Sequence, residues 1–165
     1  MAKSRASYST IQIVLHWLVA ALVLFQLFFG ESMQAVVDAK DGGGEISATD
    51  QILGSAHYWI GLIILVLVSL RLAARRIFGA PVPPRSGHEW TQMAARISHW
   101  LFYALLVLTP IAGLLAFHVG DPWGDIHKFN KPAFIFLIVI HGLAALYHQF
   151  WLKDGTLRRM ILPMH

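Results

Sequence analysis

The chain has 165 residues, of which 56% are hydrophobic and only 13% are charged, and this balance excludes an ordinary soluble domain and a disordered chain. The sequence contains no cysteine, which excludes a disulfide scaffold and a thiolate-bound metal. The formal net charge of +4 does not indicate a nucleic-acid partner, because the basic residues stand at the ends of long apolar segments rather than in a patch of their own. We therefore expect an integral membrane protein in contact with lipid.

Four segments contain no Asp, Glu, Lys or Arg, and each is 20 to 25 residues long. A helix of that length crosses the roughly 30 Å hydrocarbon layer. The sequence thus predicts an all-α membrane protein, a four-transmembrane-helix bundle forming a single domain over 1–165, with helices at about 8–30, 51–76, 90–118 and 126–152. The first helix is expected to be retained rather than cleaved as a signal peptide, because its apolar run is too long and no small-x-small site follows.

Lys and Arg are distributed unequally between the two ends of these helices. With the N-terminus inside, ten of the 13 lie on the inner side, and only Lys40, Lys128 and Lys131 lie outside. The positive-inside rule then places both termini in the cytoplasm. The outer segments also hold seven of the nine acidic residues, so the outer face is expected to be negative.

The connections between the predicted helices have simple signatures. Residues 31–50, with three consecutive glycines, are expected to form a flexible outer loop. Residues 121–124, Asp-Pro-Trp-Gly, are expected to form an outer turn. Pro81, Pro83 and Pro84 are expected to keep the inner loop extended.

Nine histidines are present, and most lie within or beside the predicted spans, where an ionisable side chain is costly and usually functional. Helix rise places His16 about 8 Å inside the inner boundary and His57 about 9 Å inside the outer one. His127 and His141 are 14 residues apart on the last helix, a separation of nearly four full turns and about 21 Å, so they share one face at two depths. His141 then matches His16 in depth, and His127 matches His57.

Two stacked histidine pairs in a four-helix bundle are the geometry that two six-coordinate b-type haems require, because each flat macrocycle takes one imidazole from each side. The sequence therefore predicts two haem b groups, with iron bound by His16 and His141 at the inner level and by His57 and His127 at the outer level. Four residues after three of these histidines stand the small residues Ala20, Gly61 and Ala145, which leave room for a ring plane against the helix.

Several other residues are candidates near these sites. His99 lies at the inner level and is an alternative to His16, while His118 is an alternative to His127, because Pro132 could make the last helix begin after His127. Arg71 follows His57 by 14 residues, which suits either a contact with an inner haem propionate or a lipid-facing anchor. His148, seven residues beyond His141, is interpreted as a quinone proton donor, a propionate contact or an interfacial histidine.

A set of local motifs extends over most of the chain: Tyr8-Ser9 before His16-Trp17, His57 with Arg71 and Arg75, Pro110, Gly113 and Pro122-Trp123, then His127, His141, His148, Phe150-Trp151, Lys153-Asp154-Gly155-Thr156-Leu157 and Arg159-Met160. In these motifs the sequence resembles the bacterial cytochrome b561 family, whose best understood member type is superoxide oxidase. The resemblance implies a di-haem cytochrome of the bacterial inner membrane with the same four ligands. It also implies that the outer haem accepts electrons from superoxide and that the inner haem passes them to ubiquinone.

The electron donor has two candidates. For superoxide, Lys128 and Lys131 provide a local positive spot, although the negative balance of the outer segments opposes long-range attraction. The alternative is a cytochrome b subunit that carries electrons between a hydrogenase or dehydrogenase partner and quinone, with the acidic segment 31–50 as a docking surface. A lipid desaturase is disfavoured because its clustered histidine boxes are absent, and a transporter because the four spans contain no Asp or Glu.

Overall fold

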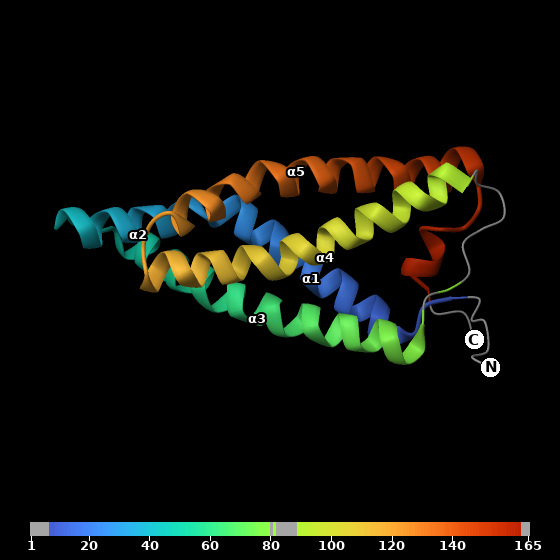
Figure 1. Cartoon of the computed structure of the whole chain (residues 1–165), viewed down its shortest axis with the longest axis horizontal. Coiled ribbons are helices and arrows are strands. Elements are labelled where there is room, and N and C mark those ends of the chain that lie inside the picture. The colour runs from blue at the N-terminus through green and yellow to red at the C-terminus, as the bar shows by residue number, and fades with distance from the viewer. Residues whose placement is uncertain (1–6, 80, 82–88, 163–165) are drawn as a thin grey trace.

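The computed structural model describes residues 7–79, 81 and 89–162, which form a long helical bundle in which the first and last described residues, Ser7 and Leu162, lie at the same end (Figure 1). Several residues used in the prediction lie outside the described ones: Lys3, Arg5, Pro83, Pro84, Arg85, His88 and His165. Following the predicted orientation, the end at which Ser7 and Leu162 lie is called the inner end, and the opposite end is called the outer end.

Four long helices make up the bundle. They are α1 (Thr10–Phe29), α3 (Ala48–Phe78), α4 (Glu89–His118) and α5 (Trp123–Tyr147). All four are long and apolar enough to cross a membrane, and the candidate span of α5 continues to Leu152. Each lies within a few residues of a helix expected from the sequence. The chain is therefore an all-α, multi-pass membrane protein.

Polar contacts of Ser9 and Gln12 determine where α1 begins. The Ser9 side chain accepts a hydrogen bond from the Gln12 backbone, and the Gln12 side chain accepts one from the Ser9 backbone, which completes a capping box. Gln12 Nε2 also donates to the Gly79 carbonyl at 2.9 Å. This bond ties the start of α1 to the end of α3 at the inner end of the bundle.

The prediction of a flexible loop over 31–50 is wrong in its first part. Residues Glu31–Gly42 form a helix, α2, which follows α1 after Gly30 and lies along α3 (Figure 1). An acidic residue, Glu31, stands in its first turn and Lys40 in its last, as the helix dipole favours, and Gly43 ends it with φ +69°. A Cβ on Gly54 of α3 would collide with Val36 of α2, so this glycine permits the close packing of the two helices.

Helix α5 begins at Trp123, so His127 lies within the helix and Pro132 lies inside it. The alternative start of this helix, after His127, is not observed. Since α5 runs without a break from Trp123 to Tyr147, His127 and His141 belong to one helix, as the depth argument requires.

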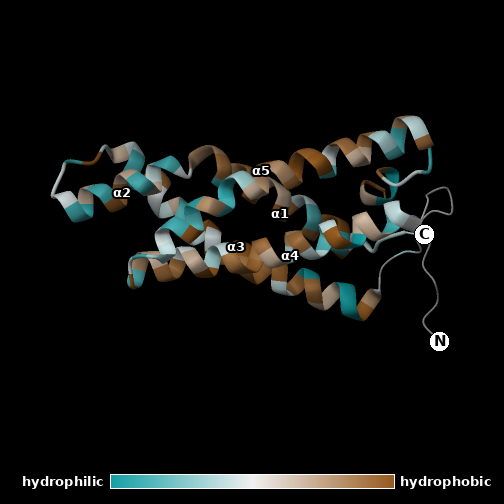
Figure 2. Ribbon diagram, turned by 45° about the horizontal axis from the view of Figure 1, so that its top comes forward, coloured by the Kyte–Doolittle hydropathy of each residue, from teal (hydrophilic) through white to brown (hydrophobic). Residues whose placement is uncertain are grey.

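The interior of the bundle is an apolar layer midway along the helices. Its buried members are Val19, Val23, Ile64, Val68, Tyr103, Leu106 and Phe134. On α4 and α5 these residues fall between the outer and the inner histidine of the helix, on α1 they follow His16, and on α3 they follow His57. Apolar side chains also cover the outside, among them Phe28 at 77% exposure and Phe136 at 65%, and Figure 2 shows the central parts of the long helices coloured as hydrophobic. Such an exposed apolar surface suits hydrocarbon rather than water.

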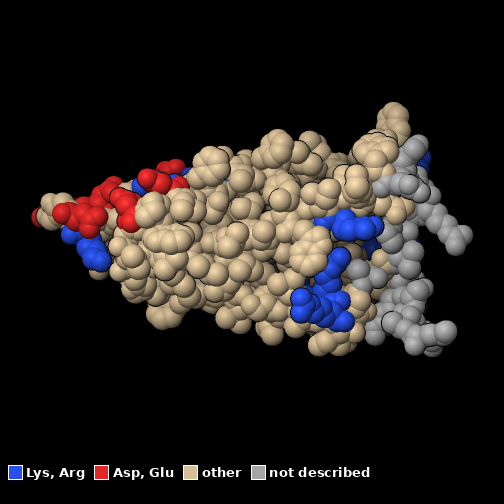
Figure 3. Space-filling view, viewed as in Figure 1, with Lys and Arg blue, Asp and Glu red and all other residues tan. Residues whose placement is uncertain are grey.

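Charged side chains gather at the two ends of the molecule. On the face shown in Figure 3, Asp and Glu cluster at the outer end around α2, while Lys and Arg lie mainly at the inner end. The tan surface between them is the part that would lie in the membrane.

Candidate functional site

His57 of α3 and His127 of α5 face each other towards the outer end, with ring centres 5.9 Å apart. Nδ1 of His127 lies 2.9 Å from the backbone carbonyl oxygen of Thr109 in α4. When Nδ1–H donates to that carbonyl, Nε2 keeps its lone pair for another partner. This second contact is typical of a histidine that binds a metal through its other nitrogen.

A glycine in α4 makes room for this pair. A Cβ on Gly113 would lie 2.9 Å from Cε1 of His127, so the ring can occupy its place only because residue 113 has no side chain. The roles of Gly113 and Thr109 were missed by reasoning from residue spacing. The sequence did contain a signal for this role: Pro110 and Gly113 lie within one turn of a long apolar helix. Both residue types are unfavourable inside a helix, so their presence indicates a local packing or functional requirement.

A cavity of about 730 Å³ adjoins the outer pair. This volume lies in the range of roughly 300–1,000 Å³ that is typical of pockets for cofactors and small molecules. Its inner wall is apolar and includes Leu27, Ile64, Leu106 and Phe134. Charged residues from three segments also line it: Glu31, Asp38, Asp41, Asp121, Lys128 and Lys131.

Three histidines meet near the inner end. The ring centre of His141 in α5 lies 6.3 Å from that of His16 in α1 and 5.9 Å from that of His99 in α4. Arg71 of α3 interacts electrostatically with all three rings. The structure thus brings together the predicted inner pair, the alternative ligand and the predicted propionate contact.

The spacing of these rings fits a bis-histidine haem iron. Two metal–nitrogen bonds of about 2 Å, with each nitrogen about 1.2 Å from its ring centre, require ring centres about 6.4 Å apart. The outer pair and both inner pairings are close to this value, so distance alone leaves His16 and His99 as alternatives. Two further atoms suit a polar cofactor, because Nδ1 of His57 and Nη1 of Arg71 are buried without a hydrogen-bond partner in the part of the chain that the structure describes.

The remaining predicted residues lie at the ends of the bundle. Lys131 is paired with Glu31 of α2, with its Nζ 3.4 Å from Oε1, and Lys128 is exposed beside it. His118, the alternative outer ligand, contacts Tyr58, with 3.5 Å between the hydroxyl oxygen and Nε2. His148 follows the inner end of α5 and pairs with Asp154. The Lys131 contact could not be predicted, because residues 31–42 were interpreted as a loop.

Comparison with known proteins identifies the family. The family model described as prokaryotic cytochrome b561 matches residues 7–163. The chain is 36% identical over 157 residues to cytochrome b562 of Cereibacter sphaeroides, covering 94% of this chain and 96% of that protein. It is 27% identical over 177 residues to the protein named probable superoxide oxidase CybB of Yersinia pestis, covering 93% and 95%, and 27% identical over 179 residues to cytochrome b561 homolog 1 of Escherichia coli, covering 93% and 96%. The chain belongs to the prokaryotic cytochrome b561 family.

Proposed function

We propose that this membrane electron carrier takes electrons from superoxide at its outer end and delivers them to ubiquinone at its inner end, in the bacterial inner membrane with both termini in the cytoplasm. The observation that carries the proposal is the pair of histidine levels on opposite sides of one apolar layer. Haem b, the cofactor of the family, supplies one-electron oxidation and reduction when bound. The proposal places one haem b at each level.

The side chains at each level have distinct tasks in this proposal. His57 and His127 hold the outer haem, and the Thr109 carbonyl orients the ring of His127. His16 and His141 hold the inner haem, and the Arg71 guanidinium balances the charge of a propionate. The apolar layer keeps water out of the space between the two levels, since Val68 is fully buried and Ile64 is 4% exposed.

Superoxide is proposed as the donor because of the relationship to the protein named probable superoxide oxidase CybB. Each superoxide anion loses one electron and becomes dioxygen. Lys128 and Lys131, both lining the outer cavity, attract the anion over a short distance.

Ubiquinone is proposed as the acceptor at the inner end. Two electrons from two superoxide anions, together with two protons from the cytoplasm, convert it to ubiquinol. His148 is the proposed proton donor, because its side chain is 25% exposed at the inner end of the helix that carries His141.

A second donor is favoured by one observation at the outer cavity. Four acidic residues line it against two lysines, and Glu31 neutralises part of the charge of Lys131. A redox partner protein with a basic surface would be attracted to this acidic rim, whereas superoxide would be repelled at long range.

A superoxide pulse in a stopped-flow instrument tests the proposal. The oxidised protein, reconstituted in lipid with ubiquinone, should be reduced rapidly and should yield one ubiquinol for every two superoxide anions consumed. The matched control is His57→Ala, which should react slowly because the outer haem is not held. If the wild-type protein reacts as slowly as this control, superoxide is not the donor and the partner-fed function replaces it.

A further inference from the structure

Helix α5 ends in an unusual way. After Tyr147 the residues His148–Leu152 form a π-helical turn, η1, and Lys153 then takes a left-handed conformation with φ +50°. The chain reverses, so that the Asp154 backbone nitrogen lies 3.3 Å from the His148 carbonyl oxygen. Both the π-turn and a non-glycine residue with positive φ are uncommon, and both occur preferentially at functional sites.

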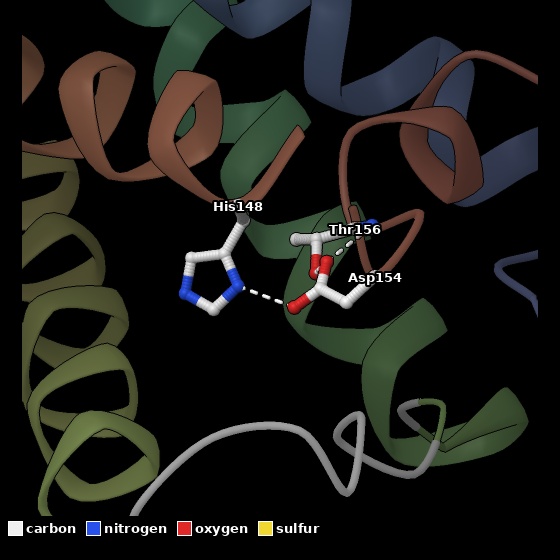
Figure 4. A network of polar contacts seen from close by, with 3 residues as sticks. All are labelled: His148, Asp154 and Thr156. Atoms are coloured by element: carbon white, nitrogen blue, oxygen red, sulfur yellow. Dashed lines mark hydrogen bonds and ion pairs between the residues drawn. The ribbon is translucent and has the colours of Figure 1, made fainter. Parts of the chain in front are cut away.

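This reversal of the chain brings the buried carboxylate of Asp154 into contact with the imidazole of His148. Oδ2 of Asp154 lies 2.5 Å from Nδ1 of His148, while Oδ1 accepts hydrogen bonds from the Thr156 hydroxyl at 2.7 Å and from the Thr156 backbone at 3.0 Å (Figure 4). The Asp154 side chain is only 3% exposed, against 25% for His148. The carboxylate is therefore held from both sides, and the imidazole keeps one open edge.

The segment that carries Asp154 is fastened to the start of α1. Trp17 Nε1 donates to the Met160 carbonyl at 2.7 Å, and the buried Ser7 hydroxyl lies 3.3 Å from the Arg159 carbonyl. Because these contacts join residues far apart in the sequence, they fix the position of the carboxylate relative to the bundle.

The charge state of Asp154 determines which nitrogen of the ring carries the proton. Burial raises the pKa of Asp154, but hydrogen bonds from Thr156 and His148 outweigh burial and leave the pKa below its ordinary value. An ionised carboxylate only accepts hydrogen bonds, so Nδ1 of His148 must carry a hydrogen. The other ring nitrogen points away from Asp154 (Figure 4).

We propose that Asp154 is a positioning residue for proton transfer at the inner end: its carboxylate keeps a proton on Nδ1 of His148 and presents Nε2 to ubiquinone. This inference rests on the proposed function. It adds that the Asp154 carboxylate determines which nitrogen of His148 exchanges protons with ubiquinone. Nε2–H of the imidazolium gives one proton to a quinone oxygen as the quinone is reduced, and the ring becomes neutral with its hydrogen on Nδ1. Nε2 then takes the next proton from cytoplasmic water.

Nitrogen NMR of the holoprotein, labelled with ¹⁵N-histidine and held in lipid nanodiscs, tests the positioning directly. The signals of His148 are those that disappear in His148→Gln. In the wild type the neutral ring should carry its hydrogen on Nδ1. In Asp154→Asn the amide can donate to Nδ1, so the hydrogen should move to Nε2, whereas Asp154→Glu keeps a carboxylate and should keep the wild-type pattern. A His148 pattern that is unchanged in Asp154→Asn overturns the proposal.

The rate of electron transfer from the reduced holoprotein to ubiquinone tests the consequence. Asp154→Asn should slow it by about 10- to 100-fold, by analogy with the loss found when the hydrogen-bond partner of a metal-bound histidine is removed, and Asp154→Glu should recover most of the rate. Unchanged haem spectra in both variants show that the bundle is intact. A hydrogen that moves to Nε2 without any loss of rate also overturns the proposal.

The two proposals fail in different ways. If the wild-type holoprotein transfers no electrons to ubiquinone, the proposed acceptor is wrong. The NMR comparison of wild type, Asp154→Asn and Asp154→Glu decides in that case whether Asp154 positions His148.

Discussion

The outer and inner histidine levels are built in different ways. At the outer level two histidines meet beside a cavity of about 730 Å³. The Thr109 carbonyl and the space left by Gly113 fix the position of the His127 ring. At the inner level three histidines converge near Arg71, a partly buried residue whose Nη1 is buried. The outer level thus combines an accessible cavity with a histidine ring held in place, while the inner level offers three histidines as candidate ligands. The following experiments are ordered by the size of the expected effect on this contrast.

Removing a histidine of the outer pair should have the largest effect. His57→Ala and His127→Ala should each lower the haem-to-protein ratio from two to one, with the outer haem lost and the inner one kept, and His141→Ala should lose the inner haem only. The reason is that six-coordinate haem b requires an imidazole on each side. The ratio is measured by the pyridine haemochrome method, with reduced-minus-oxidised spectra to identify the remaining haem. Two haems retained in His127→Ala would transfer the ligand role to His118.

Alanine substitutions at the inner level should distinguish His16 from His99, whose rings lie at similar distances from His141. His16→Ala should lose the inner haem, whereas His99→Ala should retain it with a shifted spectrum, since His99 then acts only as a nearby polar group. The same two measurements apply. The reverse outcome would mean that His99, at 5.9 Å from His141, is the ligand.

Adding one methyl group at Gly113 should disturb the outer level alone. A Cβ there would lie 2.9 Å from His127, so Gly113→Ala should displace the ring and destabilise the protein by about 1–3 kcal/mol, as overpacking does. A lower midpoint of thermal loss of the outer haem absorbance measures this. Gly42→Ala is the matched control, because a Cβ there meets nothing within 4 Å. Equal midpoints in the two variants would contradict the role of Gly113.

Charge changes at the outer cavity should have the smallest effect. Lys128→Glu with Lys131→Glu should lower the second-order rate of reduction by superoxide about tenfold at low salt, and added salt should slow the wild type, because exposed charges are screened over about 8 Å at physiological ionic strength. Glu31→Gln should act in the opposite direction by releasing Lys131 from its ion pair. A rate that is indifferent to salt and to all three changes would favour the partner protein as donor.

The sequence predicted the parts of the molecule that depend on period and length. Apolar runs gave the four spans, and helix rise and rotation gave the depths of His57 and His127, which the structure brings face to face. Helix α2 was not predicted in this way because its stability comes from packing on α3, where Val36 contacts Gly54. Hydropathy alone does not report such a contact.

The contact between Asp154 and His148 could not be predicted for a different reason. The sequence placed His148 by counting in steps of a regular α-helix, but the chain forms a π-turn there and reverses at Lys153. A short reversal of this kind depends on local backbone geometry that no hydrophobic period encodes. The roles of Gly113 and Thr109 were missed for a related reason. Gly113 contributes the space for the His127 ring and Thr109 contributes a backbone carbonyl, and neither role involves a reactive side chain.

The apolar layer around Val68 has an electrical consequence. It separates His127 from His141, which the helix rise places about 21 Å apart in a hydrocarbon layer of roughly 30 Å. An electron that moves inward across this layer crosses most of the membrane voltage, against an interior that is already negative, at a cost of up to about 2.3 kcal/mol per 100 mV. Proton uptake from the cytoplasm adds to the same charge separation, so each turnover of the proposed reaction would help to energise the membrane.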